Sequence, residues 1–225
     1  MKLTEEDLRL TLEVGEYVGI AIGQARLHAR VRESEARLAH QVLHDPLTGL
    51  ANRRLFDDRL SHALERASRE DKKVAVLYLD LNGFKEINDR YGHEAGDELL
   101  VQTSRRLASC LRTSDTAARL GGDEFALLLE DVKDEGDARR TAGRLFEKLT
   151  SPFTIDGYET AITASIGISL NDGEGVGESR QGSGELIRKA DLAMYHAKRN
   201  GKNRLATFGT ATSGWDPTRP DVSSE

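Results

Sequence analysis

The continuous apolar run at residues 74–79, Val-Ala-Val-Leu-Tyr-Leu, constrains the fold of this chain more than any other feature. A strand without polar alternation has both faces of its sheet covered. The run is followed at once by Asp80, so a charged side chain lies where a buried strand ends. We therefore expect a central strand that carries a carboxylate to one edge of the sheet.

A second constraint is the pair Gly121-Gly122, which separates two short strand-like runs. Glycine adopts positive φ without steric cost, so the pair predicts a tight hairpin turn. A turn without side chains also leaves room for a bulky ligand. Asp123 and Glu124 follow, at the turn and at the start of the next strand. If this hairpin pairs beside the central strand, their carboxylates meet Asp80 at one edge of the sheet.

Carboxylates that converge in this way repel one another unless a cation lies between them. Mg²⁺ held by one or two carboxylates and by substrate phosphates is the arrangement of nucleotidyl-transfer sites. Asp80 and Asp123 are therefore candidate metal ligands. Taken one at a time, each acid is as readily a solvated side chain at a strand end or a surface turn. Their conjunction favours the metal.

The order of the remaining elements predicts an α+β fold of the ferredoxin-like, nucleotidyl-cyclase type, with an antiparallel-rich central sheet flanked by helices. From residue 74 this order is strand, two helices, hairpin, helix, strand, helix, strand. Helices are predicted at residues 52–68, 82–91, 93–111, 134–150 and 183–199, and strands at 74–79, 116–120, 124–130, 153–155, 160–170 and 205–208.

Charge and cysteine usage narrow the function. The chain carries 32 Lys and Arg against 38 Asp and Glu, a net charge of −6. Binding of a nucleic-acid polymer needs a basic field, so this class and a template-dependent polymerase on a related sheet are disfavoured. Cys110 is the only cysteine, which excludes an intrachain disulfide and fits a reducing, cytoplasmic compartment. No stretch approaches the ~20 apolar residues that span a bilayer, so no membrane partner is expected.

Residues 5–43 carry a helical pattern with no proline until Pro46. A helix this long cannot bury its apolar stripe against one compact domain, and a parallel coiled coil with a second copy is the natural partner. We expect a homodimer through this helix; a helix that is only docked or partly frayed is the alternative. The predicted domains are a helical linker at 1–44, a folded domain at 45–208, and a disordered polar tail at 209–225.

Residues 45–208 resemble a GGDEF domain, the catalytic module of diguanylate cyclases. Several motifs at the spacing of that family carry the resemblance. They are Asp45-x-Leu47-Thr48-Gly49-Leu50-x-Asn52-Arg53-Arg54, the run Asp80 to Asp89, Gly92-His93-x-x-Gly96-Asp97, the run Gly121 to Phe125, Ala190-Asp191-x-Ala193-Met194-Tyr195-x-Ala197-Lys198 and Gly201-Lys202-Asn203. Residues 1–44 resemble the last helix of a GAF sensory domain running into a signalling linker, which suggests a fragment of a longer sensor or a short version of one.

The resemblance implies a metal site built on the two converging aspartates. Mg²⁺ (or Mn²⁺) would be held by Asp80 and Asp123, with the carbonyl of Leu81 and the carboxylate of Glu124 nearby. Asp80, Asp123 and Glu124 would be the catalytic residues.

The same resemblance implies that Asn88 and Asp97 read guanine. An aspartate accepts from guanine N1–H and N2–H₂, whereas adenine offers no N1–H there. The wrong base would leave a charged acceptor unpaired, which carries a large penalty. GTP is therefore the expected substrate, in preference to ATP.

The same resemblance implies that positively charged side chains and backbone groups would hold the phosphates. Gly121 and Gly122 would leave room for the nucleotide. Lys202 stands where the family often has Arg, and lysine keeps the charge but lacks the bidentate fork. Asn82 replaces a frequent Asp and removes one possible outer acid. The expected phosphate contacts come from Phe84, Lys85, Lys198 and Lys202.

The implied reaction joins two GTP molecules. The 3′-hydroxyl of one attacks the α-phosphorus of the other, and pyrophosphate leaves. The product, cyclic di-GMP, has two-fold symmetry, so two protomers facing each other would each present one GTP. The long N-terminal helix would bring them together.

A product-inhibition site is implied by Arg112 and Asp115. Arginine can form a fork on a phosphate or a guanine edge, and an aspartate can accept from guanine N1–H. A plain surface ion pair is the alternative. Arg139, Arg140 and Arg144 are candidates to complete this site. A second overall hypothesis is a catalytically inactive GGDEF receptor that binds cyclic di-GMP here and signals through the N-terminal helix.

Overall fold

The computed structural model describes residues 24, 26–28, 42–155, 157–171, 182–201 and 203–209. The chain divides into two compact units, Met1–Val42 and Leu43–Glu225. In the first, the residues described at 24 and 26–28 are helical. The predicted coiled coil lies almost wholly outside the described residues, as does nearly all of the predicted tail. Within the described ranges, none of the helices has the length and apolar character needed to cross a bilayer.

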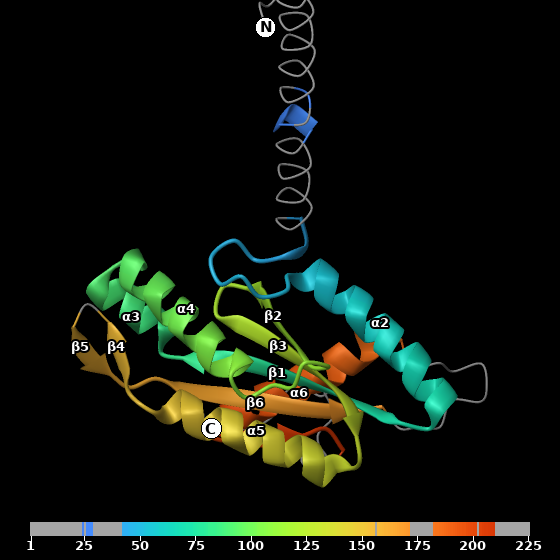
Figure 1. Ribbon diagram of the computed structural model, residues 1–225. Coiled ribbons are helices and arrows are strands. Elements are labelled where there is room, and N and C mark those ends of the chain that lie inside the picture. The colour runs from blue at the N-terminus through green and yellow to red at the C-terminus, as the bar shows by residue number, and fades with distance from the viewer. Residues whose placement is uncertain are drawn as a thin grey trace, which may run out of the picture. The chain divides into compact units, whose positions relative to one another are not determined.

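The second unit is built on a five-stranded sheet in the order β2-β3-β1-β6-β7 (Figure 1). Neighbouring strands are antiparallel except for β6 and β7, which run parallel. This confirms the predicted α+β, antiparallel-rich architecture. The strands are β1 (Lys73–Asn82), β2 (Thr116–Gly121), β3 (Glu124–Val132), β6 (Thr163–Leu170) and β7 (Leu205–Thr207).

Helices cover both faces of this sheet. The buried residues of α4 and α5 form one core cluster with the sheet, and those of α2 and α6 form another. The helices are α2 (Arg53–Glu70), α3 (Phe84–Tyr91), α4 (His93–Ala108), α5 (Glu135–Thr150) and α6 (Ser183–Arg199). The side-chain oxygen of Asn52 accepts from Leu55 N and caps α2, and Asp134 caps α5 in the same way through Asp137 N.

Side chains alternate between the two faces of the sheet along β1, and this alternation determines the face on which Asp80 lies. Leu77 and Leu79 pack with α4 and α5, whereas Val76 and Tyr78 pack with α2 and α6. Successive strand residues point to opposite faces. Asp80 therefore lies on the same face as Tyr78, under α2 and α6.

The structure corrects two predicted boundaries near this site. β1 continues to Asn82, so Asp80 lies inside the strand rather than at its end. Asn82 belongs to the sheet because its amide donates to Thr163 Oγ1 at 3.1 Å and accepts from Ser165 Oγ at 3.1 Å. Helix α3 begins only after Gly83, whose φ of 90° turns the chain.

The structure divides the strand predicted at 160–170 between two strands that belong to different sheets. Residues Tyr158–Thr160 form β5, which pairs with β4 (Phe153–Ile155) in a separate two-stranded sheet. The main-sheet strand β6 starts at Thr163. The sequence between them has no glycine or proline to mark the change of partner. The predicted helix at 93–111 also ends early, at Ala108, where Cys110 N bonds Leu107 O in a tighter turn.

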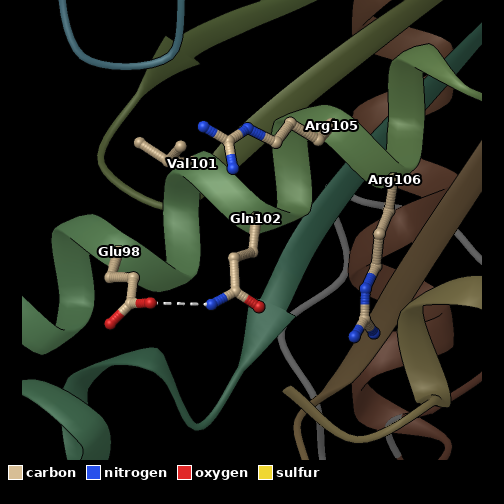
Figure 2. A pocket seen from close by; sticks show the side chains of 5 residues that line it. All are labelled: Glu98, Val101, Gln102, Arg105 and Arg106. Atoms are coloured by element: carbon tan, nitrogen blue, oxygen red, sulfur yellow. Dashed lines mark hydrogen bonds between the residues drawn. The ribbon is translucent and has the colours of Figure 1, made fainter. Parts of the chain in front are cut away.

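The outer side of α4 anchors the connection from α5 to β4. Arg106 donates to Lys148 O at 2.9 Å and to Ser151 O and Pro152 O at 2.5 Å each. Figure 2 shows Arg106 beside Gln102, whose amide bonds Glu98. These side chains line a pocket on α4, the helix that packs on the sheet face opposite Tyr78. The arginine satisfies carbonyls at the end of α5 that the helix itself leaves unpaired.

Gly167 lets α6 lie directly on the sheet. A Cβ at this position would stand 2.0 Å from Ala190 O and 2.2 Å from Met194 N. Gly167 in β6 pairs with Tyr78 in β1, so the close approach falls beside the central strand. The side chains of α6 are thereby brought up to the polar end of β1.

Candidate functional site

The signature hairpin pairs beside the central strand, as expected. Glu124 opens β3 and is the register partner of Asp80 in β1. Gly122 and Asp123 form the turn that joins β2 to β3, and Gly122 has a φ of 50°. The carboxylates of Asp80, Asp123 and Glu124 therefore lie at one end of two adjacent strands, on the face covered by α2 and α6.

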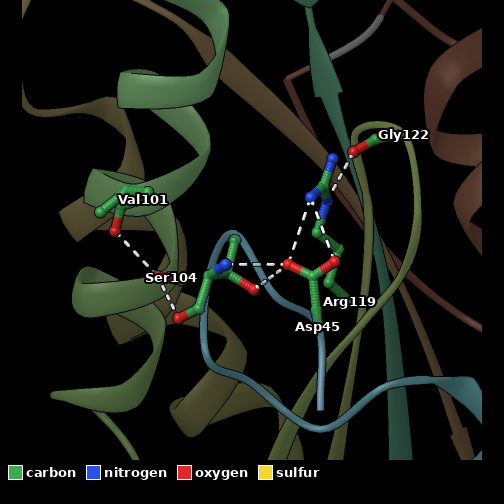
Figure 3. Close-up of polar contacts among 6 residues, drawn as sticks. Asp45, Val101, Ser104, Arg119 and Gly122 are labelled. Atoms are coloured by element: carbon green, nitrogen blue, oxygen red, sulfur yellow. Dashed lines mark hydrogen bonds and ion pairs between the residues drawn. The ribbon is translucent and has the colours of Figure 1, made fainter. Parts of the chain in front are cut away.

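An ion pair holds this turn from the side (Figure 3). Arg119 Nε donates to Gly122 O at 2.9 Å, and its Nη1 lies 3.2 Å from Asp45 Oδ1. Thr48 donates to the same carboxylate from its backbone N and its hydroxyl, at 2.8 and 2.6 Å. Burial raises the pKa of Asp45, but the bonds from Thr48 and the charge of Arg119 outweigh it and leave the pKa below its ordinary value. The charged pair thus links the segment after residue 42 to the turn.

The ionised form of the Asp123 carboxyl is disfavoured in the folded protein. Burial raises its pKa, and the negative charges of Asp80 and Glu124 raise it further. A backbone hydrogen bond and the Lys198 ammonium oppose these effects without cancelling them. The ionised carboxylate of Asp123 therefore destabilises the folded protein. A bound cation would relieve this destabilisation.

Asp80 is the most buried member of the group, with 8% of its surface exposed. Lys198 Nζ, from α6, lies 2.7 Å from Asp80 Oδ1. Oδ1 is shielded from solvent, and the Lys198 ammonium is its partner in an ion pair. A metal ion bound at Asp80 would therefore take the place of the Lys198 ammonium at this oxygen.

The donor set fits a magnesium ion that shares its ligands with a substrate. Among the residues that the structure describes, no group of three or more His, Cys, Asp or Glu side chains is placed to hold a metal ion by itself. Mg²⁺ in nucleotide sites is commonly held by one or two carboxylates, with phosphates and water completing the octahedron. Asp80 and Asp123 supply that number of carboxylates.

Three residues join this site although the sequence alone assigned them no role: Tyr78, Arg53 and Asp191. Tyr78 OH donates to Glu124 Oε2 at 3.0 Å. Burial, followed by the charge of Glu124, raises the pKa of Tyr78 to about 12, although a hydrogen bond with Arg53 opposes the shift. Asp191 on α6 has its pKa raised by burial and by the charges of Glu124 and Asp80. Tyr78 could have been found from its spacing, because it precedes Asp80 by two strand residues.

The predicted guanine pair lies on α3 and α4. A Cβ on Gly96 would stand 1.9 Å from Asn88 Oδ1, so the Asn88 side chain rests directly against the backbone of α4. Asp97 is the next residue and is exposed. Asn88 thus lies against the residue that precedes Asp97, across the α3–α4 hairpin.

The predicted phosphate contacts are only partly described. Phe84 and Lys85 open α3, whose N-cap Gly83 provides no side-chain hydrogen bond to the first turn. Backbone N–H groups at such a helix start suit an anion. Leu81 lies in β1, paired with Ala164. Lys202 lies outside the described residues.

The predicted inhibitory pair is already hydrogen-bonded within the protein. Asp115 Oδ2 accepts from Arg112 N at 2.9 Å, and Oδ1 accepts from Glu130 N at 3.3 Å. Burial raises the pKa of Asp115, while Arg112 and Arg144 oppose the shift. Of the three candidate arginines, Arg144 therefore acts on Asp115. Arg140 pairs with Asp137 at 3.2 Å, and Arg139 donates to Thr207 Oγ1 at 3.0 Å.

Comparison with known proteins places this geometry in a family. The sequence matches the family model described as the diguanylate cyclase GGDEF domain over residues 42–204. It is 43% identical over 196 residues to the bifunctional diguanylate cyclase/cyclic di-GMP phosphodiesterase MucR of Pseudomonas aeruginosa, covering 84% of this chain and 28% of MucR. It is 45% identical over 181 residues to the diguanylate cyclase TpbB of P. aeruginosa, covering 79% of this chain and 40% of TpbB. The chain therefore spans less than half the length of these relatives.

Solved structures agree with the fold. The GGDEF domain of TpbB matches with a TM-score of 0.69 and 42% identity, covering 73% of this chain and 94% of that one. The coiled coil and GGDEF domain of DgcB from Caulobacter crescentus, in complex with c-di-GMP, matches with a TM-score of 0.74 and 26% identity, covering 85% of this chain and 98% of that one.

Proposed function

The chain belongs to the GGDEF family, and from this premise we propose that it is a diguanylate cyclase, which condenses two GTP into cyclic di-GMP and two pyrophosphates. The observation that carries the proposal is the state of Asp80. Its Oδ1 is buried with the Lys198 ammonium 2.7 Å away, and its negative charge helps to raise the pKa of Asp123. Two buried carboxylates whose charges repel one another favour a site that binds a cation together with the nucleotide.

The catalytic roles follow from the chemistry of the site. Mg²⁺ (or Mn²⁺), when bound, neutralises charge on the phosphates and lowers the pKa of the attacking 3′-hydroxyl. Asp80, Asp123 and the carbonyl of Leu81 would hold it, with Glu124 beside them. Lys198 neutralises Asp80 in the present structure at 2.7 Å. We expect the same ammonium to contact the phosphates once the nucleotide is bound.

The nucleotide would lie between the signature turn and α3. Asn88 and Asp97 would read the guanine edge. The triphosphate would be bound through the backbone and charge of Phe84 and Lys85 and by the cations of Lys198 and Lys202. Gly121 and Gly122, which have no side chains, would leave room for it.

Assembly remains a proposal of the same kind. Two copies joined through the N-terminal helix would place two GTP molecules face to face, as the symmetry of the product requires. The domain division at 44/45 and 208/209, the GAF-like character of 1–44 and a cytoplasmic location belong to this proposal. The alternative is a catalytically inactive receptor for cyclic di-GMP. DgcB, a structural neighbour, has been solved in complex with that dinucleotide.

The function is tested by supplying nucleotide and metal. Purified protein is incubated with Mg²⁺ and either GTP or ATP, and the products are identified by mass. We expect cyclic di-GMP and pyrophosphate from GTP, and no comparable reaction with ATP because Asp97 has no N1–H to accept from adenine. Equal consumption of ATP would contradict the assigned guanine site.

Product inhibition gives a separate prediction. Replacing Arg112 by alanine is expected to weaken cyclic di-GMP binding by at least about tenfold and to relieve inhibition, because a charge-assisted contact to the ligand is lost. The backbone N–H of Arg112 that bonds Asp115 is retained in this variant. Calorimetric titration with cyclic di-GMP measures the effect, and Arg69→Ala, at a residue that is exposed in the last turn of α2, is the matched control. Unchanged affinity in Arg112→Ala would refute the site.

A further inference from the structure

We propose that Tyr78 is a positioning residue for the reaction, in which its hydroxyl fixes the orientation of the Glu124 carboxylate at the metal site. The proposal rests on the function proposed above and assigns a role to a residue outside the signature. It starts from one contact, in which Tyr78 OH donates to Glu124 Oε2 at 3.0 Å.

The register of β1 and β3 makes this contact a diagonal one. Tyr78 pairs with Ala126, and Asp80 pairs with Glu124, so the tyrosine lies two residues along the ladder from the acid that it contacts. Diagonal neighbours on one face are within reach of an aromatic side chain. The phenol thus extends along the strand face to the end where Asp80 and Glu124 meet.

The ring has little freedom to move away. Only 5% of Tyr78 is exposed, and it belongs to the cluster that includes Phe56 and Leu60 of α2 and Met194 of α6. Opposite Tyr78 in β6 is Gly167, over which α6 packs against the sheet. A side chain enclosed in this way presents its hydroxyl in one place.

The contact has a consequence for Glu124. One carboxylate oxygen is engaged by Tyr78, so the rotation of the acid is restricted and the other oxygen is left to the metal and substrate. Partners of this kind behind a metal-binding carboxylate orient it, and their loss typically costs about 10–100-fold in metal affinity or activity. A tyrosine that only filled the core would lose nothing at the site when its hydroxyl is removed.

The test is Tyr78→Phe, which keeps the ring and removes only the hydroxyl. Its matched control is Tyr158→Phe on β5, where the residue is 69% exposed. The first readout is the Mg²⁺ dependence of cyclic di-GMP formation at saturating GTP. We expect kcat to fall by roughly tenfold and the half-saturating Mg²⁺ concentration to rise by a similar factor, with the KM for GTP nearly unchanged and the control equal to wild type.

The second readout does not need turnover. Mn²⁺ is titrated in the presence of a non-hydrolysable GTP analogue, and binding is followed by electron paramagnetic resonance. Tyr78→Phe is expected to bind Mn²⁺ several-fold more weakly than wild type, and to cause no further loss in a Glu124→Ala background, because the two residues act as one unit. Wild-type Mn²⁺ affinity in Tyr78→Phe would overturn the inference.

These experiments distinguish a failure of the proposed cyclase function from a failure of the positioning role of Tyr78. If wild-type protein makes no cyclic di-GMP, the proposed enzymatic function is wrong, and the Mn²⁺ titration alone decides the role of Tyr78. If wild type is active and Tyr78→Phe matches it in kcat and in Mg²⁺ dependence, the positioning role is wrong while the function stands.

Discussion

Asp123→Asn is expected to reduce the rate of cyclic di-GMP formation by on the order of 10²–10³-fold or more, the loss seen when one group that stabilises transition-state charge is removed. The amide keeps the size of the side chain but removes its negative charge. Asp80 would then be the one aspartate ligand left, with Glu124 beside it, and an amide oxygen is a weaker partner for a hard cation.

The same variant is expected to keep or gain stability, which separates a catalytic from a structural role. Burial, with the charges of Asp80 and Glu124, raises the pKa of Asp123 in the folded state. A carboxyl whose folded pKa is raised destabilises the protein at pH values above that pKa, and the effect disappears as the pH falls below the unfolded value. At neutral pH asparagine therefore removes a repulsion.

Initial rates and urea unfolding at pH 7 measure the two expectations for Asp123→Asn together. Asp58→Asn is the control, because Asp58 is exposed on α2 and its ion pair with His62, at 3.7 Å, lies within the same helix. A variant at position 123 that stayed fully active would show that the metal assignment is wrong. Loss of activity that came with a large loss of stability would indicate a structural role instead.

Gly167→Ala carries the largest expected effect on stability. Its Cβ would stand 2.0 Å from Ala190 O and 2.2 Å from Met194 N, and both are backbone atoms that cannot rotate away. Helix α6 must therefore shift off the sheet, at a cost of about 1–3 kcal/mol or more, as overpacked cores show. Because α6 carries Lys198, which lies 2.7 Å from Asp80, activity should fall as well.

Gly143→Ala provides a matched control for this substitution. Gly143 lies inside α5, and an added Cβ there meets nothing within 4 Å. Alanine should stabilise this helix by about 0.5–1 kcal/mol. Urea unfolding of the two variants should thus move in opposite directions. Wild-type stability in Gly167→Ala would contradict the close packing of α6 on β6.

Local signals in the sequence were sufficient for most of the elements. Asn52 and the break at Gly92 are capping and turn signals that act within a few residues, and the structure confirms both. The predicted helix at 183–199 matches α6, Ser183–Arg199. The pairing of the hairpin with the central strand was also predictable, because a run of six apolar residues needs neighbours on both sides.

What escaped prediction depends on partners distant in sequence. The division of 160–170 between two sheets has no local marker, since only the choice of pairing strand changes. Asn82 was interpreted by its difference from a frequent Asp, but its role here is to bond Thr163 and Ser165 across the sheet. The hydroxyl of Tyr78 finds Glu124 on another strand, which the apolar appearance of the run conceals. Residue roles at the metal, guanine and inhibitory sites stay predictions.

The most direct test of the account is the initial rate of cyclic di-GMP formation from GTP and Mg²⁺, measured over a range of protein concentrations with pyrophosphate counted in parallel. The account predicts two pyrophosphates per cyclic di-GMP and a rate per protomer that rises with concentration until dimers predominate. Absence of product at the highest concentration, in protein that still binds cyclic di-GMP, would contradict it and establish the receptor alternative.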